Sequence, residues 1–269
     1  MADREWTFDV GGVALTIVGP ERWVEPFARS WGGWGVVDAD QDAARHVRLI
    51  EDDALPPVER PFFSARPLFC DGRCRLEAPG FAGEIARGET GVLRANRQAE
   101  PGDLSYFVRT AFALEAFEQG AFLFHAAGVV QRGAVFLFFG ESGSGKTTAA
   151  RLSRAKPVLN DDLLLLHREG ERWRAWATPF GRRRQREIRS APVRAMLRLV
   201  QAGRDAVVEM GRSVALGELV ASTPVINADP GQMGALLHRW ATLLDDIPVS
   251  FLYFRESDTF WEVIDAQFG

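Results

Sequence analysis

The segment Gly140–Thr148 (GESGSGKTT) limits the possible folds of this chain more than any other, because it fills every position of the pattern G-x-x-x-x-G-K-[ST]. An apolar run, Ala134–Phe139, precedes it, and a run suited to a helix, Thr147–Arg154, follows it. A strand, a glycine loop and a helix in this order direct backbone N–H groups toward an anion. The segment predicts a phosphate-binding loop in an α/β fold, with a mixed sheet and flanking helices.

The loop residues are the candidate ligands of a nucleotide, with ATP expected and GTP as the alternative. We expect Lys146 to reach the β- and γ-phosphates and the Thr147 hydroxyl to bind Mg²⁺. Among the 32 basic residues only Lys146 and Lys156 are lysines. A codon bias toward arginine explains the skew, and it makes a lysine at this position informative. The candidate nucleotide ligands are Gly140, Glu141, Ser142, Gly143, Ser144, Gly145, Lys146, Thr147 and Thr148.

Two adjacent carboxylates, Asp161 and Asp162, interrupt the apolar run Val158–Leu166. Burying unpaired charge is costly, so this pair needs an explanation. Neighbouring residues of a strand point to opposite faces, so at a strand end one carboxylate can face a metal and the other an acceptor hydroxyl. The alternative is a surface turn between two short strands.

The spacing between the two motifs separates classes of phosphate-loop protein. Asp161 follows Lys146 by fifteen positions, which leaves room for one short helix and a reversal into the next strand. Transporter and motor ATPases need longer insertions there, and small GTPases place their acidic metal ligand further along the chain.

This compact unit resembles the HPr serine kinase/phosphorylase family, whose members share a phosphate loop and an Asp-Asp pair with phosphoenolpyruvate carboxykinases. The likeness runs from about Leu123 to the C-terminus, and its order is most similar to the HPr-kinase-related proteins associated with modified-peptide biosynthesis. It does not include the HPr-docking segment or the phosphorylase signature of that family. The residues that carry it are FHAAGVV (Phe124–Val130), GESGSGKTT, LNDDLLLL and TPFG (Thr178–Gly181).

The resemblance implies roles for individual residues. Asp161 corresponds to the general base toward a serine hydroxyl, and Asp162 to a metal ligand. His125 matches a histidine in the strand before the loop, with a buried core histidine as the alternative. Glu187, in REIRS, resembles a glutamate that helps to hold the metal. The arginines around it form either a phosphate or acidic-substrate clamp or a solvated loop: Arg182, Arg183, Arg184, Arg186 and Arg189.

The chain divides by pattern into a small, β-rich region of residues 1–102 and a phosphate-loop kinase domain of residues 103–269. Strands are expected at Val13–Val18 and His46–Ile50 in the first part, and a hairpin at Ala121–Val130 and Ala134–Phe139 in the second. Asp103 is expected to cap a helix that ends at Gly120. Further helices are expected around Ala191–Ala202, Val214–Ala221 and Gln232–Leu244, then a strand at Val249–Phe254 and a short last helix.

Composition excludes several classes of function. The net charge of −4 gives no global field for nucleic acid or an anionic membrane. The N-terminus has charges where a signal peptide needs an apolar run, and no window is apolar enough to span a membrane, so we expect a cytoplasmic protein. Cys70 and Cys74 lack the spacing of a zinc site and are expected to be an ordinary thiol pair, with a redox pair as the alternative.

Together these features predict a kinase that uses ATP and Mg²⁺ to phosphorylate a hydroxyl, that of a serine in a peptide or protein. Two alternatives remain: a small-molecule hydroxyl kinase, and a regulatory protein that binds nucleotide without an acceptor. The intact pair of aspartates favours a kinase, because a sensor has no need of a base. Neither nucleic acid nor membrane is expected as a partner, and a homo-oligomer is left open.

Overall fold

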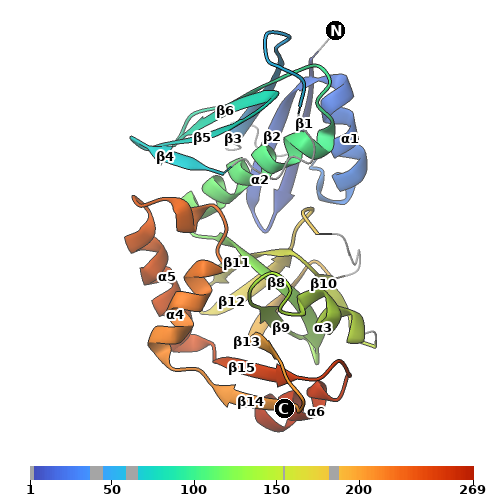
Figure 1. Ribbon diagram of the computed structural model, residues 1–269, viewed down its shortest axis with the longest axis vertical. Helices are drawn as coiled ribbons and strands as arrows, with labels where there is room; N and C mark the ends of the chain where they lie inside the picture. The colour runs from blue at the N-terminus through green and yellow to red at the C-terminus, as the bar shows by residue number, and fades with distance from the viewer. Residues whose placement is uncertain (1–2, 37–44, 59–65, 154, 182–187) are drawn as a thin grey trace. The chain divides into compact units, whose positions relative to one another are not determined.

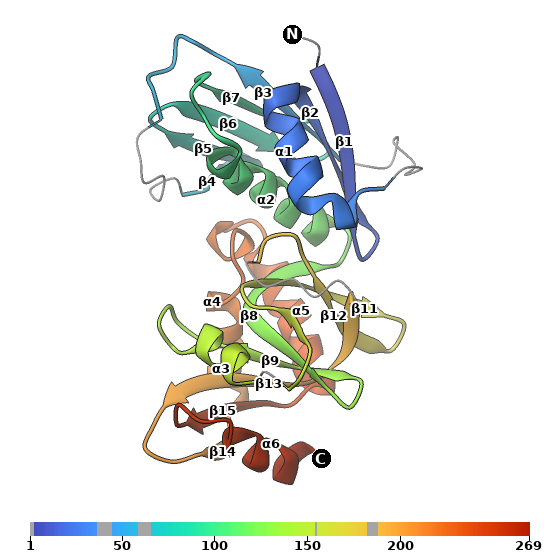
Figure 2. The ribbon, with the colours of Figure 1, turned by 90° about the vertical axis from the view of Figure 1, so that its right-hand side faces the viewer.

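The computed structural model describes residues 3–36, 45–58, 66–153, 155–181 and 188–269. Its contacts divide the chain into two units (Figures 1 and 2). The first contains Met1–Gln119 and Ala228–Gly231, and the second contains Gly120–Asn227 and Gln232–Gly269. The helix that we expected to open the kinase domain therefore belongs to the first unit, and the boundary lies at Gly120 instead of residue 103. No helix in the described ranges is long and apolar enough to cross a membrane.

The first unit is a mixed seven-stranded sheet, ordered β1-β2-β3-β7-β6-β5-β4, with two long helices. This agrees with the β-rich character expected for the N-terminal part. Its elements are β1 (Asp3–Val10), β2 (Val13–Pro20), α1 (Glu21–Trp31), η1 (Gly32–Trp34), β3 (Arg45–Glu51), β4 (Leu68–Cys70), β5 (Arg73–Ala78), β6 (Phe81–Ala86), β7 (Gly91–Ala95) and α2 (Pro101–Glu118).

Helix α2 begins one turn earlier than the sequence suggested. Glu100 is the N-cap, Pro101 follows it, and Asp103 is the third helical residue, whose carboxylate accepts a hydrogen bond from the Glu100 N–H at 2.9 Å. The two form a capping box, so the expectation that Asp103 is itself the cap was wrong. Proline suits the first helical position because it has no N–H to leave unpaired. The helix stops before Gly120, whose φ of 89° favours glycine, as expected.

The two cysteines lie on the hairpin of β4 and β5 as unpaired thiols. Cys70 is exposed and Cys74 is buried. Burial, and then the nearby Asp229 carboxylate, raise the pKa of the Cys74 thiol to about 12. A reactive redox pair needs an accessible thiolate, so this site fits an ordinary structural thiol.

The second unit is built on a mixed eight-stranded sheet, with an additional pairing that closes a ring. The strands pair in the order β8, β11, β12, β13 and β9, and β9 returns to β8. The elements are β8 (Phe122–Gln131), β9 (Ala134–Phe139), α3 (Lys146–Leu152), β10 (Val158–Asn160), β11 (Leu163–Glu169), β12 (Arg172–Ala177), β13 (Ser190–Gln201), β14 (Ala206–Glu209), α4 (Arg212–Ala221), η2 (Ile226–Ala228), α5 (Met233–Asp246), β15 (Val249–Phe254) and α6 (Phe260–Phe268).

The expected hairpin before the phosphate loop is confirmed. β8 and β9 pair antiparallel, from Gln131 with Ala134 at the turn to Ala126 with Phe139. Arg132 and Gly133 connect them with φ of 50° and 80°. Two positive values are what a two-residue hairpin turn of the type that matches strand twist requires.

The segment Ser190–Gln201 is a strand, so the expectation of a helix around Ala191–Ala202 was wrong. Strand β13 lies between parallel neighbours β9 and β15, and its first residues pair with β12. Its residues are good helix formers, but pairing on both sides and burial between neighbours outweigh that preference. The overlooked signal is an alternation of buried apolar residues: Ala191, Val193, Ala195, Leu197 and Leu199.

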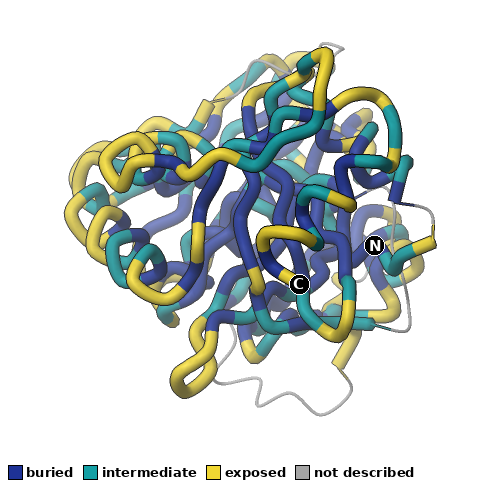
Figure 3. Tube along the Cα trace, turned by 90° about the horizontal axis from the view of Figure 1, so that it is seen from below, coloured by how far each residue is buried: buried dark blue, intermediate teal, exposed yellow. Residues whose placement is uncertain are grey.

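Aromatic side chains from the helices pack onto the strands that carry the loop. Trp240 of α5 meets the Phe122 ring of β8 at 4.6 Å between centroids, and Phe260 of α6 meets Phe138 of β9 at 5.8 Å. In Figure 3 most of the trace in the interior is coloured as buried, and the exposed residues lie at the periphery. This packing fixes the strand from which the phosphate loop emerges.

Candidate functional site

The phosphate loop leaves the end of β9 and turns directly into α3. Gly140, Gly143 and Gly145 have φ of 139°, 82° and 107°, conformations that other residues rarely adopt. Gly145 also lies against a ring: a β-carbon at this position would lie 2.6 Å from Cζ of Phe254. The backbone geometry that the motif predicts is thus present, and α3 begins at Lys146.

Lys146 is buried, and its side chain bends back over the loop. Its Nζ donates to the carbonyl oxygens of Gly140 at 2.8 Å and Glu141 at 3.0 Å. Burial lowers the pKa of its ammonium and the cation of Arg198 lowers it further, while the carboxylate of Asp162 acts in the opposite direction. An anionic group entering the loop would offer this ammonium a stronger partner than two carbonyls.

The loop continues from β9, and the two further strands of the same parallel group, β13 and β15, each provide residues that support it. Besides Phe254 from β15, β13 provides Gln201, whose Nε2 donates to the carbonyl of Gly143 at 3.0 Å. It also provides Arg198, whose guanidinium lies 3.6 Å from the Glu141 carboxylate and 3.2 Å from that of Glu218. Ligands commonly bind at the carboxyl ends of parallel strands. Sequence reasoning missed these residues because it assigned the segment of Arg198 and Gln201 to a helix.

The acidic pair occupies the turn between β10 and β11. Asp161 is buried, whereas the side chain of Asp162 is 41% exposed. Asn160, fully buried, fixes the turn: its Oδ1 accepts from the Asp162 N–H at 3.0 Å and its Nδ2 donates to the carbonyl of Thr178 at 3.0 Å. Gly181 approaches so closely that a β-carbon there would lie 2.0 Å from Asn160 Oδ1. The sequence segment Thr178–Gly181 therefore buttresses the acidic turn.

His125 of β8 lies beside the acidic pair. Its Nε2 is 3.2 Å from Oδ1 of Asp162, and its side chain is 41% exposed. The alternative of a buried core histidine was therefore wrong. Its backbone N–H donates to the carbonyl of Ser222, just after α4, at 2.8 Å. Asp162 thus lies near both His125 and Lys146, which come from separate elements.

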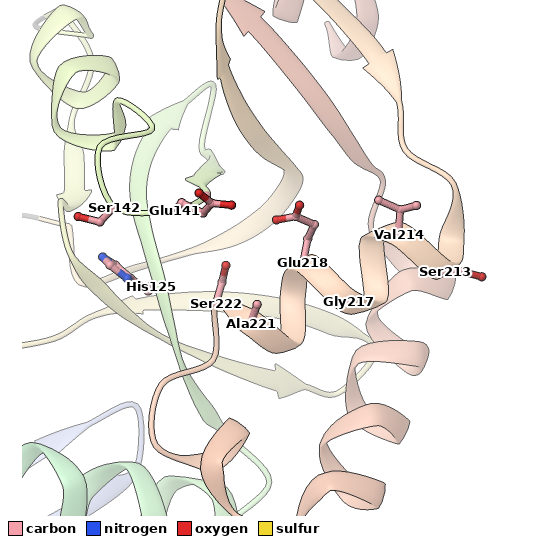
Figure 4. Close-up of a pocket in the computed structure, with 10 residues that line it drawn as sticks. His125, Glu141, Ser142, Ser213, Val214, Gly217, Glu218, Ala221 and Ser222 are labelled. Atoms are coloured by element: carbon pink, nitrogen blue, oxygen red, sulfur yellow. The ribbon is translucent and has the colours of Figure 1, made fainter. Parts of the chain in front are cut away.

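A pocket of about 550 Å³ opens between the phosphate loop and α4 (Figure 4). One wall consists of His125 and the loop residues Gly140–Ser142, and the other consists of residues of α4 and Ser222. Glu141 and Ser142 are exposed, so the loop is accessible from this side. The pocket places open space next to the residues expected to bind phosphate.

The residues of the loop suit the phosphates of a nucleotide. The hydroxyl of Ser144 is buried with no hydrogen-bond partner among the described residues, and a buried hydroxyl in that state is costly unless a ligand completes it. Thr147 at the start of α3 is exposed, so its hydroxyl is accessible to a metal. No group of three or more acidic, histidine or cysteine side chains in the described part of the chain forms a cation cage. Mg²⁺ needs no such cage when phosphate and water complete its shell.

Two expectations fall on segments that the structure does not describe. Glu187 and the arginines Arg182, Arg183, Arg184 and Arg186 lie outside the described residues, and their roles stay predictions. Arg189, from the same group, is partly buried just before β13.

No protein-family model and no curated protein sequence matches the chain. Among solved structures, the chain is similar to the HPr(Ser) kinase/phosphatase from Coxiella burnetii. The identity is 11%, the match covers 54% of this chain and 91% of that chain, and the TM-score is 0.34. A likeness at this level carries no argument about activity, which depends on the site itself.

Proposed function

We propose that this protein is a kinase that transfers the γ-phosphoryl group of ATP to a hydroxyl, that of a serine in a peptide or protein. The observation that carries the proposal is the position of Asp162. Its carboxylate lies 3.2 Å from Nε2 of His125, which lines the same pocket as the loop residues Gly140–Ser142, so the acidic turn lies near the phosphate loop. A phosphate cradle with carboxylates beside it supplies the positioning, charge neutralisation and proton acceptor that phosphoryl transfer needs.

In the proposed reaction the loop N–H groups and Lys146 hold the β- and γ-phosphates. Thr147 and Asp162 would hold Mg²⁺, which neutralises charge on the phosphates when bound. The serine oxygen forms a bond to the γ-phosphorus, the bond from that phosphorus to the β,γ-bridging oxygen breaks, and ADP leaves. Asp161 accepts the proton of the serine hydroxyl. Asn160 holds the backbone of the turn that carries both carboxylates, through its hydrogen bonds to the Asp162 N–H and to the carbonyl of Thr178.

The substitution Asp161→Asn tests the proposed base. Asparagine has a similar size but cannot accept the proton, so transfer to a serine peptide from labelled ATP should fall about 10²- to 10⁴-fold. Affinity for ATP, measured with a fluorescent analogue, should stay within about twofold. Asp162→Asn is the matched comparison, and it should raise the Mg²⁺ concentration needed for half-maximal transfer. Unchanged transfer by the Asp161→Asn protein would eliminate Asp161 as the base.

The same measurements separate the two alternatives from the proposal. A nucleotide-binding regulatory protein would bind the ATP analogue but phosphorylate no acceptor at all. A small-molecule kinase would phosphorylate free hydroxyl compounds and leave serine peptides unlabelled.

A further inference from the structure

One wall of the pocket has no role in the proposed phosphoryl transfer. This wall is a single face of α4, because its residues recur at the three- and four-residue spacing of helix neighbours. The wall residues from the helix and its end are Ser213, Val214, Gly217, Glu218, Ala221 and Ser222. Gly217 and Ala221 make its middle small, Glu218 adds a carboxylate there, and Val214 is 51% exposed at the outer end.

The position of this wall relative to the reacting groups is fixed. The carbonyl of Ser222 accepts the backbone N–H of His125 at 2.8 Å, so the end of α4 is attached to β8 beside the acidic turn. Figure 4 shows His125 and Ser142 on one side of the pocket and α4 on the other. A molecule in this pocket would have one end near the phosphates and the other along the helix.

The described side chains that line the pocket carry an excess of negative charge. Glu141 of the loop and Glu218 of α4 point toward one another in Figure 4, and the guanidinium of Arg198 lies 3.6 Å and 3.2 Å from their carboxylates. One cation therefore serves two anions. The Glu141 side chain is 85% exposed, so it remains accessible to a second cation. A bound nucleotide would add further negative charge on the same side.

We infer that this pocket receives the acceptor, and that α4 selects a peptide with a basic residue beside its serine. The inference depends on the proposed kinase activity and names the substrate class of the same site. The serine hydroxyl lies toward Asp161 and Asp162, a neighbouring side chain packs on Val214 and Gly217, and the basic group lies near Glu141 and Glu218. Exposed Val214 lets the rest of the peptide continue along the helix beyond the pocket.

Gly217 offers a way to close the pocket without disturbing the fold. A β-carbon at this position would meet nothing within 4 Å, and its φ is not in the left-handed region. Leucine is also a better helix former than glycine, so Gly217→Leu should keep α4 folded while its side chain enters the acceptor space. The matched control is Gly234→Leu on α5, where a β-carbon likewise meets nothing within 4 Å and which is not a pocket residue.

The experiment uses the full chain, labelled ATP with Mg²⁺, and a set of serine peptides with arginine, alanine or glutamate at each flanking position. The wild-type protein should favour an arginine peptide over its alanine counterpart by about fivefold in kcat/KM, as an exposed charge pair allows. That preference should weaken as salt is added. Gly217→Leu should raise the peptide KM at least about tenfold while leaving ATP affinity unchanged, and Gly234→Leu should behave as wild type.

Glu218→Gln tests the charge separately from the shape. It should remove most of the arginine preference, measured as the ratio of kcat/KM for the arginine peptide to kcat/KM for the alanine peptide. A wild-type peptide KM for Gly217→Leu, or a preference for glutamate peptides, would overturn the inference and leave the kinase proposal standing. Intact ATP binding with no serine peptide labelled would overturn both.

Discussion

At the level of single residues, Lys146 is the strongest support for nucleotide binding. It is buried with a lowered pKa, and its Nζ rests on carbonyls of the loop, so it is held at the point where phosphates would enter. The chain has one other lysine, Lys156, whose Nζ lies 4.5 Å from the centre of the Trp261 ring. Substituting Lys156 removes the same charge outside the proposed site, so it is the control for substituting Lys146 inside it.

Replacing Lys146 by alanine should abolish high-affinity nucleotide binding, with a rise in Kd of at least about 100-fold. Charge-assisted hydrogen bonds to phosphate are about twice as strong as neutral ones, and alanine removes the ammonium that would donate them. Isothermal titration with ATP and Mg²⁺ measures the effect. Lys156→Ala should bind as wild type. An alanine variant at Lys146 with wild-type affinity would remove the basis of the phosphate-loop assignment.

At the level of elements, the geometry of the acidic turn between β10 and β11 depends on a second segment, Thr178–Gly181. Asn160 is hydrogen-bonded both to the Asp162 N–H and to Thr178, and Gly181 leaves the space that its amide needs. The backbone of the acidic turn is therefore held in place by the chain that follows β12. A change at Gly181 acts on the acidic pair without touching it.

Gly181→Ala should reduce phosphoryl transfer about tenfold or more and raise the Mg²⁺ concentration needed for half-maximal transfer. The new β-carbon would lie 2.0 Å from Oδ1 of Asn160, so the amide must move and release the Asp162 backbone. Such overpacking costs about 1–3 kcal/mol, which chemical denaturation would measure. Gly203→Ala is the control, because a β-carbon there meets nothing within 4 Å. Normal Mg²⁺ dependence in a destabilised Gly181→Ala protein would show that the turn does not position the metal ligand.

The two units of the whole molecule have separate sheets, and every described residue of the proposed site belongs to the second. A ligand that binds only folded protein stabilises the unit that binds it. The first unit has its own buried core, including Trp23, whose Nε1 donates to the carbonyl of Ala99 at 2.9 Å. The two should therefore respond differently to nucleotide.

Saturating ATP and Mg²⁺ should raise the unfolding temperature of the second unit by roughly 5–10 °C, since ligand at 100 times Kd contributes about 2.7 kcal/mol. The first unit should unfold at an unchanged temperature. Calorimetry combined with hydrogen exchange would assign each transition to its strands. Equal shifts in both units would mean that they unfold as one cooperative body.

The sequence by itself determined the phosphate loop, its hairpin and the acidic pair. These features are local: positive φ at the glycines, an apolar strand and a helix start are encoded within about twenty neighbouring residues. Helix α2 was also found from its pattern, although its cap was misplaced by one turn, because Pro101 and Glu100 were not recognised as the start.

Only the tertiary structure decided what surrounds the loop. Arg198 and Gln201 reach it because β13 pairs with β9, and no local pattern encodes which distant segment becomes a neighbouring strand. The helix-forming residues of β13 concealed that pairing, since propensity is weaker than burial between two strands. The wall of α4 likewise faces the loop through a contact between residues far apart in sequence, His125 and Ser222. The sequence therefore located the glycine loop, and the folded chain placed the pocket beside it.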